Sequence, residues 1–207
     1  MPDTVLTTEY KVNRKLGYLI PKRIFDVVVS VILLIVLLLP MAIVALLIRL
    51  ESPGPVIYTQ ERLGRNGKPF KMYKFRSMRN DAEKNGPQWA KVGDPRCTKV
   101  GKVIRVWHID ELPQLWNVVL GQMTIVGPRP EREFFYREFE KELPNFRQRM
   151  LVEQGLTCIA QVNGCYDLTP EGRLAFDMEY IQKQSLWTDF KCIMKTFVVL
   201  FNHKGAR

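Results

Sequence analysis

One stretch of the chain, Val27–Ile48, holds 22 residues without a charged side chain, and it limits the possible folds more than any other feature. At the rise of an α-helix it is long enough to cross about 30 Å of hydrocarbon. It is also too long for the apolar region of a cleaved signal peptide. The stretch therefore predicts that part of the chain resides in a membrane.

Two features favour a helix that enters the membrane and returns on the same side. Pro40 lies inside the stretch, where it frees the carbonyl group of Val36 and bends a helix. Basic residues flank the stretch at both ends, and such residues favour the cytoplasmic side. They are Lys11, Arg14, Lys15, Lys22 and Arg23 before it, and Arg49, Arg62, Arg65, Lys68, Lys71 and Lys74 after it. We expect a re-entrant membrane helix over residues 23–50, with its kink at Pro40.

The rest of the chain divides into a short lead and one larger domain. Residues 1–22 are polar and basic, which predicts a disordered lead or a surface helix. Residues 51–207 carry short strand patterns and amphipathic helical patterns, and they are expected on the cytoplasmic face. A strand is expected at 56–60, a basic strand or a surface helix at 70–75, and helices at 99–105, 112–119, 131–150, 170–183 and 185–202. The predicted fold class is α+β and predominantly helical, with the last helix lying in the membrane interface.

Charge narrows the possible partners. The chain has 31 Lys and Arg against 21 Asp and Glu, a net charge of +10, which indicates an anionic partner. Nucleic acid, acidic lipid and a phosphorylated substrate all satisfy this condition. The neighbouring apolar stretch favours anionic membrane lipids over nucleic acid. The four cysteines show neither C-x-x-C spacing nor a disulfide pattern, so free thiols in a reducing compartment are expected.

A pair of adjacent carboxylates, Asp110 and Glu111, precedes an amphipathic helical pattern. The apolar residues Leu112, Leu115, Trp116 and Val119 recur at helical spacing, and Gly121 follows at a C-cap position. Asp110 could be an ordinary N-cap, but Pro113 has no N–H to offer it. Arg129 lies between Pro128 and Pro130, which fix the backbone around a guanidinium suited to a phosphate or a carboxylate.

Five motifs in order carry a resemblance to a known family. They are K-R-I-F-D at 22–26, the segment from Gln60 to Met78, D-E-L-P-Q-L-W-N-V at 110–118, V-G-P-R-P at 126–130 and A-Q-V-N-G at 160–164. From about residue 20 onwards the chain resembles the monotopic phosphoglycosyl transferases, the bacterial sugar transferase family. It resembles the small form that consists of the catalytic domain alone.

The resemblance implies transfer of a sugar-1-phosphate from a UDP-sugar to polyprenyl (undecaprenyl) phosphate, with release of UMP. Such a reaction starts glycoconjugate or exopolysaccharide synthesis at the cytoplasmic face of the bacterial inner membrane. By resemblance, Asp110 forms a covalent phosphosugar intermediate and holds Mg²⁺, and Glu111 assists the lipid phosphate or the metal. The other residues implied to bind phosphate or substrate are Arg105, Arg129, Asp189, Gln161 and Asn163, with Asp189 suited to positioning or to metal support.

Several positions depart from the family pattern. They are Leu39, where serine is often found before the proline, Glu153-Gln154, which replaces a basic residue and proline, Cys158 in place of glycine, and Cys165 in place of arginine. The sugar, the glycan built from it and the oligomeric state, a homodimer included, are not specified by the sequence. A non-catalytic basic membrane scaffold remains the alternative, although it gives no reason for Asp110-Glu111 beside Pro128-Arg129-Pro130.

Overall fold

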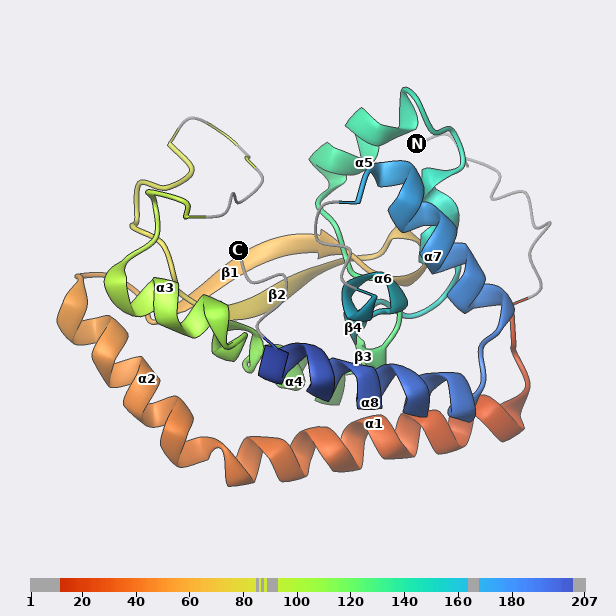
Figure 1. The fold of residues 1–207 in the computed structure, drawn as a ribbon, viewed down its shortest axis with the longest axis horizontal. Helices are drawn as coiled ribbons and strands as arrows, with labels where there is room; N and C mark the ends of the chain where they lie inside the picture. The colour runs from red at the N-terminus through yellow and green to blue at the C-terminus, as the bar shows by residue number, and fades with distance from the viewer. Residues whose placement is uncertain (1–11, 85, 87, 89–92, 164–167, 203–207) are drawn as a thin grey trace.

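The computed structural model describes residues 12–84, 86, 88, 93–163 and 168–202 (Figure 1). Within them, helices predominate over short strands, so the predicted α+β, mainly helical class is confirmed. The helices are α1 (Leu16–Val36), α2 (Leu38–Glu51), α3 (Lys99–Val106), α4 (Gln114–Val119), α5 (Glu133–Glu140), α6 (Ile159–Val162), α7 (Pro170–Gln182) and α8 (Leu186–Asn202). The strands are β1 (Ile57–Leu63), β2 (Pro69–Phe75), β3 (Thr124–Val126) and β4 (Gly155–Thr157).

The apolar stretch forms two helices, α1 and α2, that meet at Leu37 with a bend of 62°. Pro40 lies in the first turn of α2, where backbone N–H groups have no partner inside the helix and a proline is tolerated. The helix begins at Leu16, earlier than the expected residue 23, and so takes in part of the predicted lead. Among the described residues, neither helix alone is long and apolar enough to cross a membrane, but the bent pair meets that test together.

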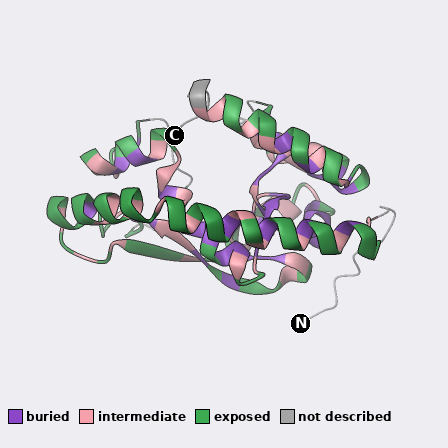
Figure 2. Cartoon of the chain, turned by 90° about the horizontal axis from the view of Figure 1, so that it is seen from below, coloured by how far each residue is buried: buried purple, intermediate pink, exposed green. Residues whose placement is uncertain are grey.

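The outer surfaces of α1, α2 and α8 are apolar. Figure 2 looks at α1 and α2 from below and shows mostly exposed residues along both helices. The exposed side chains include Ile24, Val28, Ile32, Leu39, Leu46 and, on α8, Trp187, Phe190 and Phe197. The buried residues of α1 are instead polar and recur every fourth position: Tyr18, Lys22, Asp26 and Ser30. The helix therefore turns a polar stripe inward and an apolar surface outward, the reverse of a helix in a water-soluble domain.

Two small sheets lie on the inner side of these helices. β1 and β2 form an antiparallel hairpin, and β3 pairs with β4 in parallel. A core of Val118, Met123, Ile125, Val126 and Ile181 joins α4, β3 and α7. The single helix predicted over 131–150 is wrong: α5 ends at Glu140, and the 3₁₀ helix η3 (Phe146–Leu151) follows Pro144. A proline disfavours helical backbone at the residue before it, which explains the break.

Helix α2 is joined to α3 through its last residue. The Glu51 carboxylate accepts hydrogen bonds from the backbone N–H groups of Lys99 (2.6 Å) and Val100 (3.0 Å), in the first turn of α3. Thr98 caps the same turn by accepting from the Gly101 N–H at 2.9 Å. The orientation of α3 is therefore tied to the end of α2.

Gly155 makes the close approach of β3 and β4 possible. A Cβ atom at this position would lie 2.2 Å from the backbone nitrogen of Gly127 and 2.4 Å from its carbonyl oxygen. We expect Gly155→Ala to lower the free energy of unfolding by about 3 kcal/mol, because neither backbone can move away cheaply. Thermal unfolding of the detergent-solubilised protein measures this. Gly17→Ala is the control, since a Cβ there meets nothing within 4 Å, and equal unfolding temperatures for the two variants would contradict the close packing.

Candidate active site

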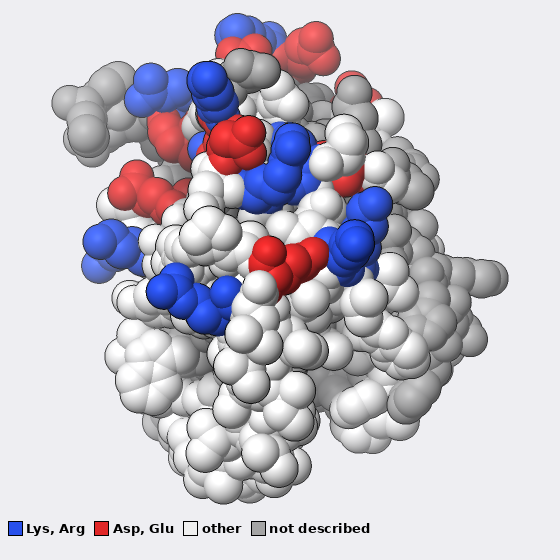
Figure 3. Space-filling view, turned by 90° about the vertical axis from the view of Figure 1, so that its left-hand side faces the viewer, with Lys and Arg blue, Asp and Glu red and all other residues white. Residues whose placement is uncertain are grey.

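A cavity of about 500 Å³ lies between the β1–β2 hairpin, the end of α3, the loop after β3 and the start of α7. Among its described lining residues, ten are Lys or Arg and five are Asp or Glu. Figure 3 shows the face on the left-hand side of Figure 1, where Lys and Arg side chains surround Asp and Glu side chains. A concave surface with this charge excess favours an anionic ligand that carries more than one charge.

Asp110 enters this cavity from η2 (Ile109–Glu111), the 3₁₀ turn between α3 and α4. His108, the residue before η2, has a φ of 55°. This left-handed conformation is uncommon outside glycine and turns the chain sharply. The Asp110 side chain does not cap α4, whose N-cap is Pro113, so the N-cap alternative is wrong. Gly121 has φ 79° and ends α4 as predicted, with its N–H and that of Gln122 bonded to the carbonyls of Val118 and Asn117.

The two carboxylates of the pair have opposite surroundings. Asp110 is only 7% exposed, and within the described part of the chain no hydrogen bond or ion pair engages its carboxylate. Burial, followed by the negative charge of Glu111, raises the pKa of Asp110 to about 6, although Lys74, Arg105 and Arg129 oppose this. At neutral pH Asp110 is therefore mostly ionised, and its oxygens point into a cavity of cations.

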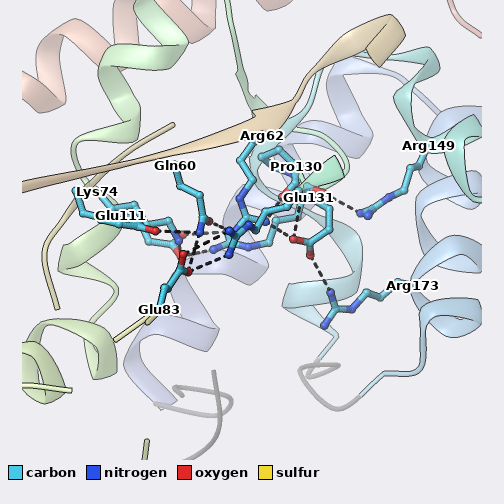
Figure 4. Close-up of polar contacts among 12 residues, drawn as sticks. Gln60, Arg62, Lys74, Glu83, Glu111, Pro130, Glu131, Arg149 and Arg173 are labelled. Atoms are coloured by element: carbon cyan, nitrogen blue, oxygen red, sulfur yellow. Dashed lines mark hydrogen bonds and ion pairs between the residues drawn. The ribbon is translucent and has the colours of Figure 1, made fainter. Parts of the chain in front are cut away.

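Glu111 is held by two cations (Figure 4). Arg129 forms a fork with it, with Nη1 donating to Oε2 at 3.0 Å and Nη2 donating to Oε1. Lys74 Nζ lies 3.4 Å from Oε1. Burial acts to raise the pKa of the Glu111 carboxyl, but Arg129 and then Lys74 outweigh it and hold this pKa well below its ordinary value. Glu111 thus stays ionised and orients the side chains of Arg129 and Lys74.

Two further arginines, Arg149 and Arg62, donate hydrogen bonds to the backbone carbonyl groups of Arg129 and Pro130. Arg149 donates from Nη2 to the Arg129 carbonyl oxygen at 2.9 Å and forms an ion pair of 2.7 Å with Asp177, and both side chains are almost fully buried. Arg62 donates to the Pro130 carbonyl oxygen at 3.2 Å and pairs with Glu131. Figure 4 shows these contacts converging on the loop after β3. The sequence did not indicate Arg149 or Asp177, since neither lies in a recognisable motif.

The other predicted site residues divide into two groups. Arg105 and Gln161 line the cavity; Arg105 donates to the Ser77 hydroxyl at 3.4 Å, and Gln161 accepts from the Cys158 thiol at 3.2 Å. Asn163 and Asp189 are not among the described lining residues. Asn163 accepts from Lys195 at 3.0 Å, and Asp189 lies in a buried cluster with Lys22, Tyr18 and Tyr180.

Three of the positions that depart from the family pattern, Cys158, Gln154 and Glu153, make contacts within the fold. Cys158 is buried and caps α6, with its sulfur accepting from the Gln161 N–H at 3.4 Å. Gln154 is fully buried and donates to the carbonyls of Arg149 and Val152, both at 3.0 Å. Glu153 pairs with Arg65. Cys165 and residues 1–11 of the predicted lead lie outside the described residues.

A buried carboxyl group in a cavity whose described lining includes ten Lys and Arg side chains is an arrangement suited to phosphoryl transfer. Residues 17–203 match the family described as bacterial sugar transferase. The chain belongs to this family, and it is a phosphoglycosyl transferase, as the resemblance implied.

Three relatives illustrate the match. A Bacillus subtilis protein provisionally named undecaprenyl-phosphate N-acetylgalactosaminyl 1-phosphate transferase is 53% identical over 133 residues, which are 64% of this chain and 74% of the relative. A UDP-N-acetylgalactosamine-undecaprenyl-phosphate N-acetylgalactosaminephosphotransferase of Aeromonas hydrophila is 40% identical over 94% of this chain and 48% of its own length. A UDP-glucose:undecaprenyl-phosphate glucose-1-phosphate transferase of Escherichia coli is 39% identical over 89% and 41%. The chain thus spans less than half the length of the last two relatives.

Proposed function

We propose that the protein transfers a sugar-1-phosphate from a UDP-sugar to undecaprenyl phosphate and releases UMP. The observation that carries this proposal is Asp110, a buried carboxyl group without a hydrogen-bonding partner among the described residues, in a cavity lined by cations. The names of the relatives support the two substrates. A non-catalytic scaffold would have no use for a carboxylate kept buried in this way, because burial of an unpaired charge is costly.

The proposed reaction is a double displacement at one phosphorus atom. An Asp110 carboxylate oxygen attacks the sugar-linked phosphorus, and the bond to the bridging oxygen breaks, so that UMP leaves with the electron pair. A phosphate oxygen of undecaprenyl phosphate then attacks the same phosphorus and expels the Asp110 carboxylate. Arg129 and Lys74, oriented by Glu111, and Arg105 on the opposite wall stabilise the charge on the phosphate oxygens.

The residues present fit Mg²⁺ only as an ion shared with the substrate. Among the described residues, no group of three His, Cys, Asp or Glu side chains could hold a metal, and Glu111 is engaged by Arg129 and Lys74. Asp110 is the one carboxylate of the pair without such an engagement, and Mg²⁺ is commonly held by one or two carboxylates together with substrate phosphates. We propose that Asp110 holds Mg²⁺, which when bound would neutralise charge on the diphosphate.

We further propose that α1 and α2 form a re-entrant pair with the domain on the cytoplasmic face of the inner membrane, in contact with anionic lipids. The bend at Leu37 and the apolar outer surfaces support this arrangement. Cysteines introduced at the exposed positions Lys15 and Lys68 should then react with a membrane-impermeant thiol reagent from the same side of inverted vesicles. Labelling of the two positions from opposite sides would refute the re-entrant topology.

The activity is tested with purified protein in detergent, undecaprenyl phosphate, Mg²⁺ and a panel of UDP-sugars that includes UDP-glucose and UDP-N-acetylgalactosamine. We expect steady-state UMP release that depends on all three components. When the lipid is left out, we expect at most one UMP per enzyme, together with a phosphosugar adduct on the protein by intact mass. UMP release with a lipid-independent steady rate, or no release with any UDP-sugar, would overturn the proposal.

A further inference from the structure

The polar stripe of α1 meets a buried carboxylate on α8. Lys22 Nζ lies 2.9 Å from Asp189 Oδ2, and the Tyr18 hydroxyl donates to the same oxygen at 3.0 Å. The Tyr180 hydroxyl lies 2.8 Å from Asp189 Oδ1. Asp189 is 6% exposed and Lys22 is 8% exposed, so the ion pair is shielded from water. Both Asp189 oxygens are thus occupied by side chains of the protein itself.

This cluster continues to the strand that leads into the active site. Lys22 Nζ and the Tyr180 hydroxyl both reach the Val126 carbonyl oxygen, at 3.1 and 2.8 Å. Val126 is the last residue of β3, and Arg129 follows it within the same loop. Asp26, one turn further along α1, accepts from the Thr124 hydroxyl at 2.5 Å and from the Ile125 N–H at 3.3 Å. Helix α1 therefore holds all three residues of β3.

The same helix also holds the other element that supports the site. Arg23 donates to the carbonyl oxygens of Val118 (2.6 Å) and Val119 (2.9 Å), at the C-terminal end of α4. α4 follows directly on the turn that carries Asp110 and Glu111. Helix α1 thus contacts both α4, which follows the two carboxylates, and β3, which precedes Arg129. These contacts place the carboxylates and Arg129 relative to one another.

We infer that Asp189 is a positioning residue for the proposed reaction: through its ion pair with Lys22 it fixes β3, and with it the loop that carries Arg129, against α1. This rests on the proposed function. Of the roles that the resemblance implied for Asp189, it keeps positioning and removes substrate binding and metal support, since both carboxylate oxygens are bonded within the cluster. What it adds is the partner, Lys22, and the element that is positioned, β3. It also gives the K-R-I-F-D segment a role in aligning the site in addition to its place beside the apolar stretch.

The test compares Asp189→Asn, Lys22→Met and the double variant that carries both. Each single change leaves a buried charge without its partner, whereas the double change removes both charges. We expect each single variant to lose about 10²-fold in kcat, the size of loss expected when a catalytic group shifts by about 1 Å. The double variant should regain most of the lost unfolding temperature, because no unpaired charge stays buried. Its kcat should stay about as low as in the single variants, because the ion pair and the Lys22 bond to the Val126 carbonyl oxygen are both missing. The Mg²⁺ concentration for half-maximal activity should be unchanged in Asp189→Asn.

Wild-type kcat in the double variant would overturn the inference, because the ion pair would then not be needed to position Arg129. A raised Mg²⁺ requirement in Asp189→Asn would overturn it too, because Asp189 would then act on the metal. If the single variants do not fold, Tyr180→Phe serves instead, because it removes only one hydroxyl from the cluster, and wild-type kcat in that variant would count against the inference. Adding Asp189→Asn to the Arg129→Ala variant should not lower kcat any further, since both changes act through Arg129.

Two controls separate this inference from a general effect of removing an ion pair and from a failure of the proposed function. The exposed pair Glu179 and Lys183 on α7 has the same charges at 2.9 Å, and Glu179→Gln with Lys183→Met should leave kcat unchanged. The wild-type protein reports on the proposed function itself. Absence of UMP release from the wild type is a failure of the proposed function, whereas an active wild type with a fully active double variant is a failure of the inference alone.

Discussion

Asp110→Asn will abolish both UMP release and the phosphosugar adduct, with a loss on the order of 10⁴-fold in kcat, as for other nucleophiles removed from their sites. Asparagine has nearly the same shape, but its amide oxygen cannot form the intermediate. The variant should fold normally, because burial and the charge of Glu111 already raise the pKa of Asp110 to about 6, so that losing the charge relieves a cost. UMP release and intact mass measure the two losses.

Glu111→Gln provides the matched control for Asp110. It leaves Asp110 in place and removes only the counter-charge that orients Arg129 and Lys74, so we expect a partial loss of activity and a detectable adduct. Full activity in Asp110→Asn would remove the nucleophile assignment. An adduct that persists in Asp110→Asn but vanishes in Glu111→Gln would assign the nucleophile to Glu111 instead.

Arg149→Met should be the most destabilising of the changes proposed around the cavity, at about 3–5 kcal/mol, the usual cost of removing one partner of a buried ion pair. It leaves the Asp177 carboxylate buried without its 2.7 Å partner and removes the hydrogen bond to the Arg129 carbonyl. We also expect activity to fall, because Arg129 loses its backbone support. Thermal unfolding and UMP release measure the two effects separately.

Arg137→Met is the comparison for this change. Arg137 pairs with Glu133 at 2.9 Å on the surface of α5, and its side chain is 73% exposed. Surface pairs of this kind contribute at most about 1 kcal/mol. Similar unfolding temperatures for Arg149→Met and Arg137→Met would mean that the Arg149–Asp177 pair does not support the cavity.

The sequence predicted the elements whose local pattern decides their structure. The strand near Ile57, the bend near Pro40 and the helix cap at Gly121 all follow from residues close together in the chain, whereas the pattern at 70–75 fits either a strand or a surface helix. It also placed Asp110, Glu111, Arg105, Arg129 and Gln161 at one site, because they lie in motifs that resemble a known family.

What the sequence did not predict depends on contacts between distant residues. Lys22 and Asp189 are far apart in the chain, and nothing in either segment indicates that they pair. Trp116 shows the same limit on a smaller scale: its spacing predicted an inward position on α4, but it is 51% exposed while Gln114 and Asn117 are buried. Asn117 is buried because it bonds β2 through the Tyr73 N–H and the Lys71 carbonyl, a tertiary partner that periodicity does not report.

If α2 lies in a membrane as proposed, the cap that Glu51 places on α3 would connect the active site to the thickness of the bilayer. Under the proposed membrane docking, α2 adjusts its tilt to the hydrocarbon around it, as apolar helices do when their length and the lipid do not match. Because Glu51 ends α2 and holds the first turn of α3, that tilt reaches the helix whose last turn carries Arg105. The length of the lipid acyl chains would then affect the turnover rate, because it would change the tilt of α2 and with it the position of Arg105.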